Sequence, residues 1–179
     1  MTSLACHRVA AWCAAAVVLA AAGAATAQTP ASGKACQAVE HHQFDFWVGH
    51  WNVFVPSGKK AGESRIEAIA DGCAILEQWS GAGGVTGKSL NIYDATDRRW
   101  HQTWVDSSGT LLMLTGGFVE RSMVLSMQGP SPSDPGKSVQ QRITWTPGAD
   151  GSVRQLWESS YDDGRTWTVL FDGRYVRVP

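Results

Sequence analysis

The feature that most constrains the fold of this chain is a two-residue alternation of apolar and polar side chains, which begins near Phe44 and continues almost to the C-terminus. Gly, Pro and Asp residues interrupt the alternation roughly every eight to twelve residues, as turns do between short strands. No helical period of about 3.6 residues persists for three turns after residue 27. The chain is therefore predicted to be all-β.

The spacing of the turn residues divides the alternating region into about ten strands. We expect them at 46–55, 62–70, 74–80, 87–93, 99–105, 110–118, 122–128, 138–146, 152–159 and 166–177. Short connections between consecutive strands favour an antiparallel up-and-down meander. Closure of the meander into a single barrel removes the free edges that promote aggregation, so a closed barrel is the predicted architecture.

The first 27 residues have the pattern of a cleaved secretory signal peptide. Arg8 is their only basic side chain, residues 9–25 are rich in Ala, Val and Leu, and Ala25-Thr26-Ala27 is a typical cleavage site. The apolar run is short and Ala-rich for a membrane-spanning helix. The predicted organisation is a signal peptide at 1–27, a flexible leader at 28–43 and a barrel domain at 44–179, in a periplasmic or secreted protein.

The charge of the remaining 152 residues is nearly balanced, with 14 Lys and Arg against 16 Asp and Glu. Nucleic acids and anionic membranes bind proteins that carry an excess of positive charge. We therefore expect no nucleic-acid partner and no membrane association after signal cleavage. The expected state is a monomer or a weak homodimer.

Two cysteines, Cys36 and Cys73, follow the predicted cleavage site. In an oxidising compartment they can form one intramolecular disulfide, which would stabilise the fold by about 4 kcal/mol in the chain-entropy description. A redox or metal-binding pair is the alternative, but the C-x-x-C spacing and the flanking histidines of such pairs are lacking.

Tryptophan is abundant, with eight of the nine residues lying after residue 27. Alternation places Trp100, Gln102 and Trp104 on one face of their strand. If the tryptophan-bearing faces point inward, the candidate ligand-binding residues are Ser89, Asn91, Trp100, Gln102, Trp104, Gln155 and Trp157. Buried amides need hydrogen-bond partners. A cavity that holds water or a ligand supplies such partners more readily than a dry core, which is the plainer alternative.

Charged residues give weaker signals than the tryptophans. Arg142 is a cation at a strand centre that could anchor a carboxylate ligand, or could point outward into solvent. Glu77, Asp106 and Glu158 could take part in acid–base chemistry if they are buried. The motifs G-x-S-x-G and H-E-x-x-H and a phosphate-binding glycine loop are not found.

The histidines after the signal peptide are His41, His42, His50 and His101. The adjacent pair lacks a third ligand at useful spacing, and the other two are expected on the outer face. We therefore predict no metal site and no cofactor.

Two further motifs are assigned structural roles. Gly49-His50-Trp51 in the first strand, with Arg177 in the last, is typical of lipocalin-like barrels, in which the guanidinium stacks on the ring at the closed end. A tryptophan placed in a turn by chance is the alternative. Residues 160–167 match the S-x-D-x-G-x-T-W pattern of an Asp-box, in which Asp162 accepts backbone N–H groups and Trp167 packs beneath a hairpin.

The chain from Cys36 to Arg177 resembles an uncharacterised bacterial family of secreted lipocalin-like β-barrel proteins. The similarity rests on FDFWVGHW at 44–51, WHQTWVD at 100–106 and DDGRTW at 162–167. It implies the barrel fold and supports pairing of Cys36 with Cys73, but it implies no reaction. Nitrobindin-type haem barrels are similar in architecture, yet their axial histidine near the C-terminus has no match here.

These observations predict an exported barrel that binds a small apolar or aromatic molecule in its interior. The first alternative is an enzyme of isomerase, cyclase or hydrolase type that uses the same cavity, although the lack of catalytic motifs argues against it. An inward carboxylate with a strongly raised pKa would favour that alternative. The second alternative is binding of haem or nitric oxide.

Overall fold

The computed structural model describes residues 35–131, 134 and 136–179, so the predicted signal peptide lies outside the described residues. The described chain forms three short 3-10 helices, η1 (Val39–His42), η2 (Asp45–Trp47) and η3 (Ala70–Gly72). Its ten strands are β1 (Gly49–Phe54), β2 (Lys60–Ile69), β3 (Ala74–Gly81), β4 (Thr86–Asp94), β5 (Arg99–Asp106), β6 (Leu111–Val119), β7 (Ser122–Pro130), β8 (Ser138–Pro147), β9 (Val153–Ser160) and β10 (Thr168–Arg177). No helix among the described residues combines the length and the apolar character needed to cross a membrane.

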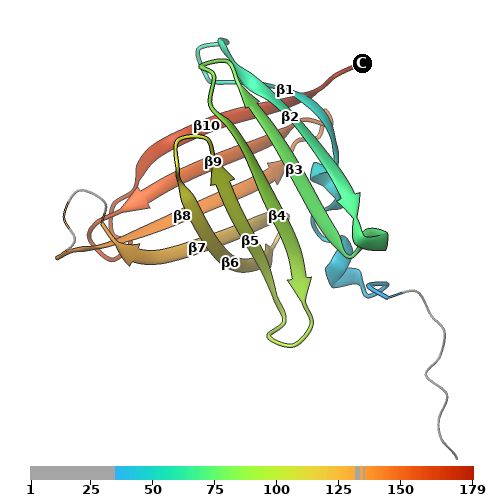
Figure 1. Ribbon diagram of the computed structural model, residues 1–179, viewed down its shortest axis with the longest axis horizontal. Helices are drawn as coiled ribbons and strands as arrows, with labels where there is room; N and C mark the ends of the chain where they lie inside the picture. The colour runs from blue at the N-terminus through green and yellow to red at the C-terminus, as the bar shows by residue number, and fades with distance from the viewer. Residues whose placement is uncertain (1–34, 132–133, 135) are drawn as a thin grey trace, which may run out of the picture. The chain divides into compact units, whose positions relative to one another are not determined.

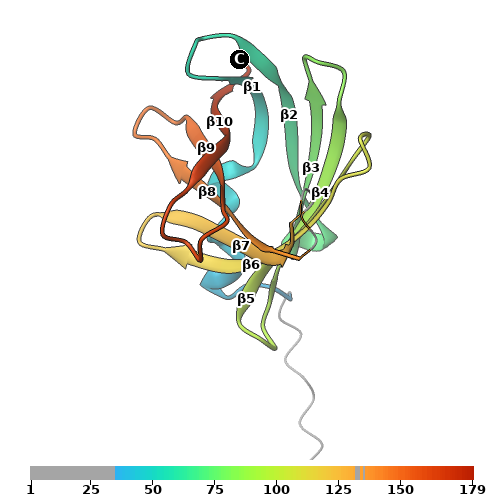
Figure 2. The same cartoon turned by 90° about the vertical axis from the view of Figure 1, so that its left-hand side faces the viewer.

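Each strand pairs antiparallel with its neighbours in the chain, and β1 closes the barrel by pairing with β10. Figure 1 shows strands β2 to β5 crossing strands β7 to β10 at a steep angle, as opposite walls of a barrel do. The view in Figure 2 shows the two walls on either side of the interior. The prediction of an all-β, antiparallel up-and-down barrel of about ten strands is confirmed.

The start of the first strand differs from the prediction. The alternation predicts a strand from residue 46, but η2 occupies Asp45–Trp47 and β1 begins at Gly49. The reason is that Phe44 and Trp47 turn into the barrel instead of extending along its wall, and neither is exposed to solvent.

One end of the barrel is closed by an aromatic plug, which we define as Phe44, Trp47, Trp51, Trp100 and Trp145. Phe44 stacks on Trp47 with ring centroids 4.8 Å apart, and its ring meets those of Trp100 and Trp145 at 5.7 and 5.2 Å. The indole N–H of Trp51 donates to the Trp47 carbonyl over 2.9 Å. These five side chains are at most 1 % exposed, so this end of the interior is filled by side chains.

Arg177 covers the plug from outside, with its guanidinium carbon 4.3 Å from the centre of the Trp51 ring. Their strands are in register at this position, because Trp51 of β1 pairs with Arg177 of β10. Gly49 makes the contact possible: its φ is +152°, and a Cβ there would overlap the Arg177 guanidinium. The G-x-W motif and the terminal arginine therefore lie together at the closed end.

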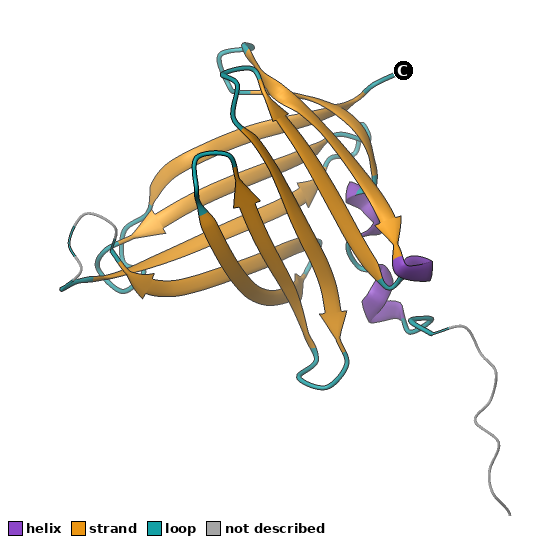
Figure 3. Cartoon of the chain, in the orientation of Figure 1, coloured by secondary structure: helices purple, strands orange, loops and turns teal. Residues whose placement is uncertain are grey.

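The predicted disulfide joins Cys36 to Cys73, with Cα atoms 5.2 Å apart. It fastens the described part of the leader to the start of β3, and η1 packs on β4 through His41 and Tyr93, whose ring centroids lie 5.1 Å apart. Figure 3 shows the three short helices gathered at one end of the barrel. The described end of the leader is thus held against the barrel rather than free.

The turn between β9 and β10 is organised around Asp162. Its carboxylate accepts hydrogen bonds from the hydroxyls of Ser160 and Thr166 and from the backbone N–H of Thr166. The indole N–H of Trp167 donates to the Gly164 carbonyl over 3.0 Å. These bonds hold the pKa of Asp162 down, to about 2, and account for the Asp-box as a local turn structure.

Candidate functional site

The barrel interior contains a cavity of about 220 Å³. Its lining residues are Glu77, Trp79, Gln102, Trp104, Asp106, Leu112, Ile143, Trp145, Gln155, Trp157, Leu170, Phe171 and Tyr175. In an up-and-down barrel, odd strands begin at the end where even strands finish. Trp79 and Asp106 come at the ends of β3 and β5, and Leu170 near the start of β10, so they mark the end opposite the plug. We call this end the mouth of the cavity.

Six aromatic rings dominate the lining, and contacts with neighbouring side chains and backbone fix several of them. Trp79 meets Phe171 edge to face, with ring centroids 6.3 Å apart. The indole N–H of Trp157 donates to Gln141 Oε1 over 2.9 Å. Trp104 packs against Gly87 of β4, where a Cβ would overlap the ring. The rings therefore form a wall whose positions are set before any guest enters.

Glu77 of β3 is the most unusual member of the lining, because it is a carboxylate only 5 % exposed. Its two oxygens accept hydrogen bonds from the hydroxyls of Ser64 on β2, over 2.9 Å, and Ser89 on β4, over 3.0 Å. Burial raises the pKa of Glu77 to about 7, and the two serine hydrogen bonds oppose this rise only in part. At neutral pH this group is therefore poised to gain or lose a proton.

A chain of hydrogen bonds connects Glu77 to the side of the cavity formed by β5. The amide nitrogen of Asn91 donates to Ser89 Oγ over 3.0 Å and to the Ile75 carbonyl over 3.2 Å. Gln102 in turn donates to Asn91 Oδ1 over 2.7 Å. Gln102 reaches the cavity, whereas Asn91 and Ser89 lie behind it and hold both Gln102 and Glu77 in place.

A second polar pair lies on the wall formed by β9 and β10. The phenol of Tyr175 donates a hydrogen bond to Gln155 Oε1. Burial, followed by the nearby charge of Glu77, raises the pKa of Tyr175 well above its ordinary value, so the phenol stays neutral. The indole N–H of Trp145, also in the lining, is buried and has no hydrogen-bond partner among the described residues.

Asp106 sits at the mouth and differs from Glu77 in its surroundings. The hydroxyl of Ser108 is the largest cause that holds its pKa down, to about 2, and the N–H groups of Thr110, Trp104 and Ser108 add to the effect. Asp106 is therefore ionised at neutral pH, at the entrance to an aromatic cavity.

The cavity brings together four of the eight residues that the sequence nominated for ligand binding. Gln102, Trp104, Gln155 and Trp157 are in the lining. Ser89 and Asn91 point inward but lie behind the lining, and Trp100 belongs to the plug instead, where Gln43 accepts its indole N–H.

The assignment of Arg142 as a ligand anchor needs correction. Alternation along β8 points Ile143 into the cavity and Arg142 away from it. Arg142 forms an ion pair with Glu158 over 2.9 Å and lies 4.1 Å from the centre of the Trp167 ring. Its charge is already paired on the outer surface, so it cannot serve a ligand in the interior.

Glu77, Trp79, Trp145 and Tyr175 were missing from the sequence-based ligand set. A usable signal for Glu77 existed, because it alternates in phase with Ile75 and Trp79 and therefore shares their inward face. A charged residue in phase with large apolar residues indicates a buried carboxylate.

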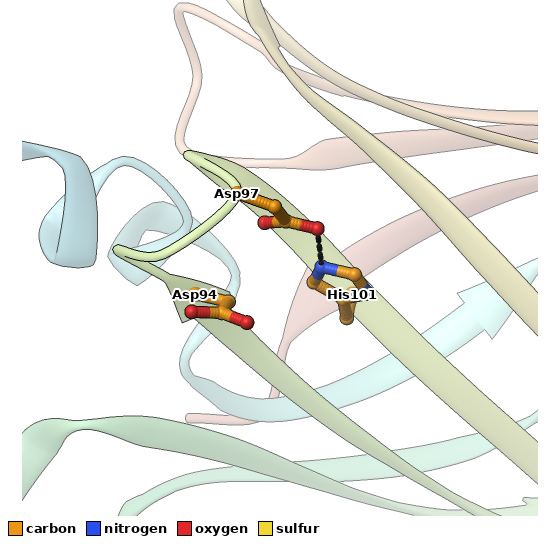
Figure 4. A group of neighbouring side chains, drawn as sticks. All are labelled: Asp94, Asp97 and His101. Atoms are coloured by element: carbon orange, nitrogen blue, oxygen red, sulfur yellow. Dashed lines mark hydrogen bonds and ion pairs between the residues drawn. The ribbon is translucent and has the colours of Figure 1, made fainter.

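One cluster outside the barrel has the composition of a metal site. Figure 4 shows Asp94, Asp97 and His101 close together at the β4–β5 turn. Their potential ligand atoms all lie within 4.8 Å of one another. Both carboxylates accept backbone N–H groups of that turn, from Thr96 and Arg99, and Asp97 also contacts His101 over 2.8 Å. Turn formation is a sufficient account of this cluster, and we assign no ion to it.

The cavity lining offers no imidazole and no thiolate, within the described part of the chain, that could ligate a haem iron. Comparison with models of known protein families gives no match, and comparison with curated proteins gives none either. The geometry and chemistry of the cavity are therefore the features that indicate a function.

Proposed function

We propose that this protein is an exported barrel that binds a small apolar or aromatic molecule in its interior. The observation that carries the proposal is the cavity itself: about 220 Å³, open at one end and walled by six aromatic rings with a few polar groups among them. Concave, mostly apolar sites with sparse polar groups are the usual form of small-molecule sites.

The size of the cavity limits the energy that a guest can gain. A single aromatic ring that buries about 150–250 Å² of apolar surface gains on the order of 4–6 kcal/mol. Part of this gain is offset by the loss of translational and rotational freedom. The proposal therefore predicts guests of one or two rings that bind in the micromolar to millimolar range.

Export and the family resemblance complete the proposal. A disulfide in a barrel without a membrane-spanning helix among its described residues is consistent with an oxidising, non-cytoplasmic location. The resemblance to secreted lipocalin-like proteins supports the same view, since barrels of that architecture enclose ligands. Native mass spectrometry of protein purified from the periplasm tests both points, through the mass of the mature chain and any co-purified ligand.

A pair of variants on β6 provides a sharper test of the cavity. Leu112 is buried and lines the cavity, whereas its neighbour Leu111 is 57 % exposed on the outer face. Leu112→Trp fills the cavity with a ring, and Leu111→Trp adds the same ring outside. Calorimetric titration with benzyl alcohol and naphthalene should show binding to the wild type and to Leu111→Trp. Leu112→Trp should bind neither probe. The proposal would be refuted if both variants bound the probes equally well. It would also be refuted if neither the variants nor the wild type bound them.

An enzyme that uses the same cavity is a second candidate, favoured by the buried Glu77 carboxylate with its pKa raised to about 7. A carboxylate in an apolar site, with a pKa near the working pH, is suited to act as a general base. If the protein is such an enzyme, Glu77 accepts a proton from the guest, and Gln102 and Tyr175 orient the guest.

5-Nitrobenzisoxazole is a suitable probe of such a base. Its C3 proton passes to the carboxylate, the C–H electron pair completes a nitrile, and the N–O bond breaks to leave a coloured phenolate. The enzyme candidate predicts turnover that rises with pH through about 7 and is lost in Glu77→Gln. A rate no higher in the wild type than in that variant would exclude Glu77 as a base.

A further inference from the structure

The titratable groups that line the cavity are all acidic. Within the described residues they are Glu77 in the interior, Asp106 at the mouth and Tyr175 on the wall, and the lining has no Lys, Arg or His. Such a cavity attracts cations and repels anions at every stage of entry. An anionic guest, such as a fatty acid or an aromatic carboxylate, would meet Asp106 first and Glu77 at its destination.

Glu77 also differs from the carboxylates of the barrel surface in its partners. On the outside, Glu63 pairs with Lys60, Glu158 with Arg142 and Asp172 with Arg154. Glu77 has only the neutral hydroxyls of Ser64 and Ser89 among the described residues. An ionised carboxylate at this depth, with two hydroxyl donors and no counter-ion, is energetically unfavourable because its charge is not balanced.

The aromatic wall has the complementary property. A cation within about 6 Å of the face of Trp or Tyr is stabilised by about 0.5–2 kcal/mol, more so where water is excluded. Trp79, Trp104, Trp145, Trp157 and Tyr175 surround the same volume that Glu77 faces. Several rings with one carboxylate form the arrangement by which proteins hold organic ammonium groups.

We infer that the guest of this cavity is a small organic cation, an alkyl- or arylalkyl-ammonium whose charged group lies against Glu77 and whose apolar part contacts the tryptophan rings. This inference rests on the proposed binding function and names the chemical class of the ligand. Asp106 attracts the cation at the mouth, and Glu77 supplies the counter-charge inside. The network through Ser89, Asn91 and Gln102 keeps the carboxylate oriented when it is ionised.

The inference couples binding to pH. The groups that face Glu77 are the hydroxyls of Ser64 and Ser89, which do not titrate in this range, and Tyr175, which stays neutral. Asp106 is already ionised. Protonation of Glu77 itself is therefore the event that should weaken cation binding as the pH falls through about 7.

Two probes of equal shape test the inference: benzyltrimethylammonium, and neopentylbenzene, in which carbon replaces the nitrogen. The quaternary ammonium has no proton to lose, so any pH dependence of its binding arises from the protein. Titrations at pH 6 and pH 8, monitored by tryptophan fluorescence, should show that the cation binds about tenfold more tightly at pH 8. At pH 8 it should also bind more tightly than the neutral probe.

Two variants identify the group responsible. Glu77→Gln keeps the shape of the side chain, and it should abolish the pH dependence and reduce the preference for the cation to what Asp106 and the rings supply. Glu63→Gln removes one negative charge from the outer face of β2 and should retain both. Equal affinities for the two probes at pH 8, or a pH dependence that persists in Glu77→Gln, would overturn the inference.

The outcomes separate this inference from the proposed function. If neopentylbenzene binds and benzyltrimethylammonium does not, the cavity binds apolar molecules and the inference about charge is wrong. If neither probe binds, and benzyl alcohol and naphthalene do not bind either, both are refuted.

Discussion

Replacing Glu77 by Gln should make the protein more stable at neutral and alkaline pH, although it removes a buried, hydrogen-bonded side chain. Gln has the shape of a protonated glutamic acid and can keep an oxygen as acceptor for Ser64 or Ser89. It needs no proton and carries no charge, so it avoids the unfavourable burial of an ionised group.

The size of this stability gain follows from the difference between the pKa values of Glu77 in the folded and unfolded states. The pKa of Glu77 is about 7 in the fold and near its ordinary value of 4.5 in the unfolded chain. Between these values the folded state keeps a proton that the unfolded state has released, so the free energy of unfolding decreases as the pH rises. The loss is about 3 kcal/mol in total and is nearly complete at pH 8, where Glu77 is ionised in both states.

The assay is urea unfolding of the wild type and Glu77→Gln at several pH values from 4 to 8.5, with Glu63→Gln as the control for loss of one charge. The difference between Glu77→Gln and the wild type isolates Glu77 from the other titrating groups. Asp106 and Asp162, whose pKa values lie near 2, contribute stability that is present above their unfolded pKa and lost at lower pH, outside this range. A difference that stays constant from pH 4.5 to 8 would refute the reasoning.

Three further predictions concern the disulfide, the plug and the polar network. Cys73→Ser should lower the free energy of unfolding by up to about 4 kcal/mol in urea titrations, and two titratable thiols in the native, unreduced wild type would contradict the bridge. Trp51→Ala removes a fully buried ring and should destabilise the protein by about 3–5 kcal/mol, measured in the same way; a loss below 1 kcal/mol would show that the ring does not support the closed end. Gln102→Leu should change which probes bind and also lower stability by about 1–3 kcal/mol, because Asn91 Oδ1 loses its donor; unchanged binding and stability would remove Gln102 from the site.

The sequence was a good guide to the strands and a partial guide to the site. Strand bounds follow from turn chemistry, which is local, so the predicted strands agree with the barrel to within one or two residues except at 46–55. There the alternation continues through Phe44 and Trp47, but burial in the barrel end outweighs it. Local pattern does not show that a segment before a strand will fold into the space that the strand encloses.

Only half of the predicted ligand set lines the cavity, and the reason differs from that at the first strand. Alternation shows which face of a strand a residue occupies, but it does not show how deep along the barrel axis the residue lies. Trp100 and Gln102 share the inner face of β5, yet Trp100 belongs to the plug and Gln102 to the cavity. The depth depends on which end the rest of the chain closes, and this is a property of the whole barrel.

The position of Glu77 bears on why the interior is divided into a filled end and an open cavity. If the interior served stability alone, an apolar side chain at this position would avoid the loss of about 3 kcal/mol that an ionised carboxylate causes at neutral pH. The serine hydroxyls and the amides of Asn91 and Gln102 keep that carboxylate oriented without neutralising it. No cationic side chain among the described residues contacts Glu77, so on the inference above the compensating charge comes from the guest. A cation of matching size would supply it, and occupied protein should lose the penalty that the free protein carries. Saturating benzyltrimethylammonium should therefore stabilise the wild type more at pH 8 than at pH 6, and should have no such pH-dependent effect on Glu77→Gln.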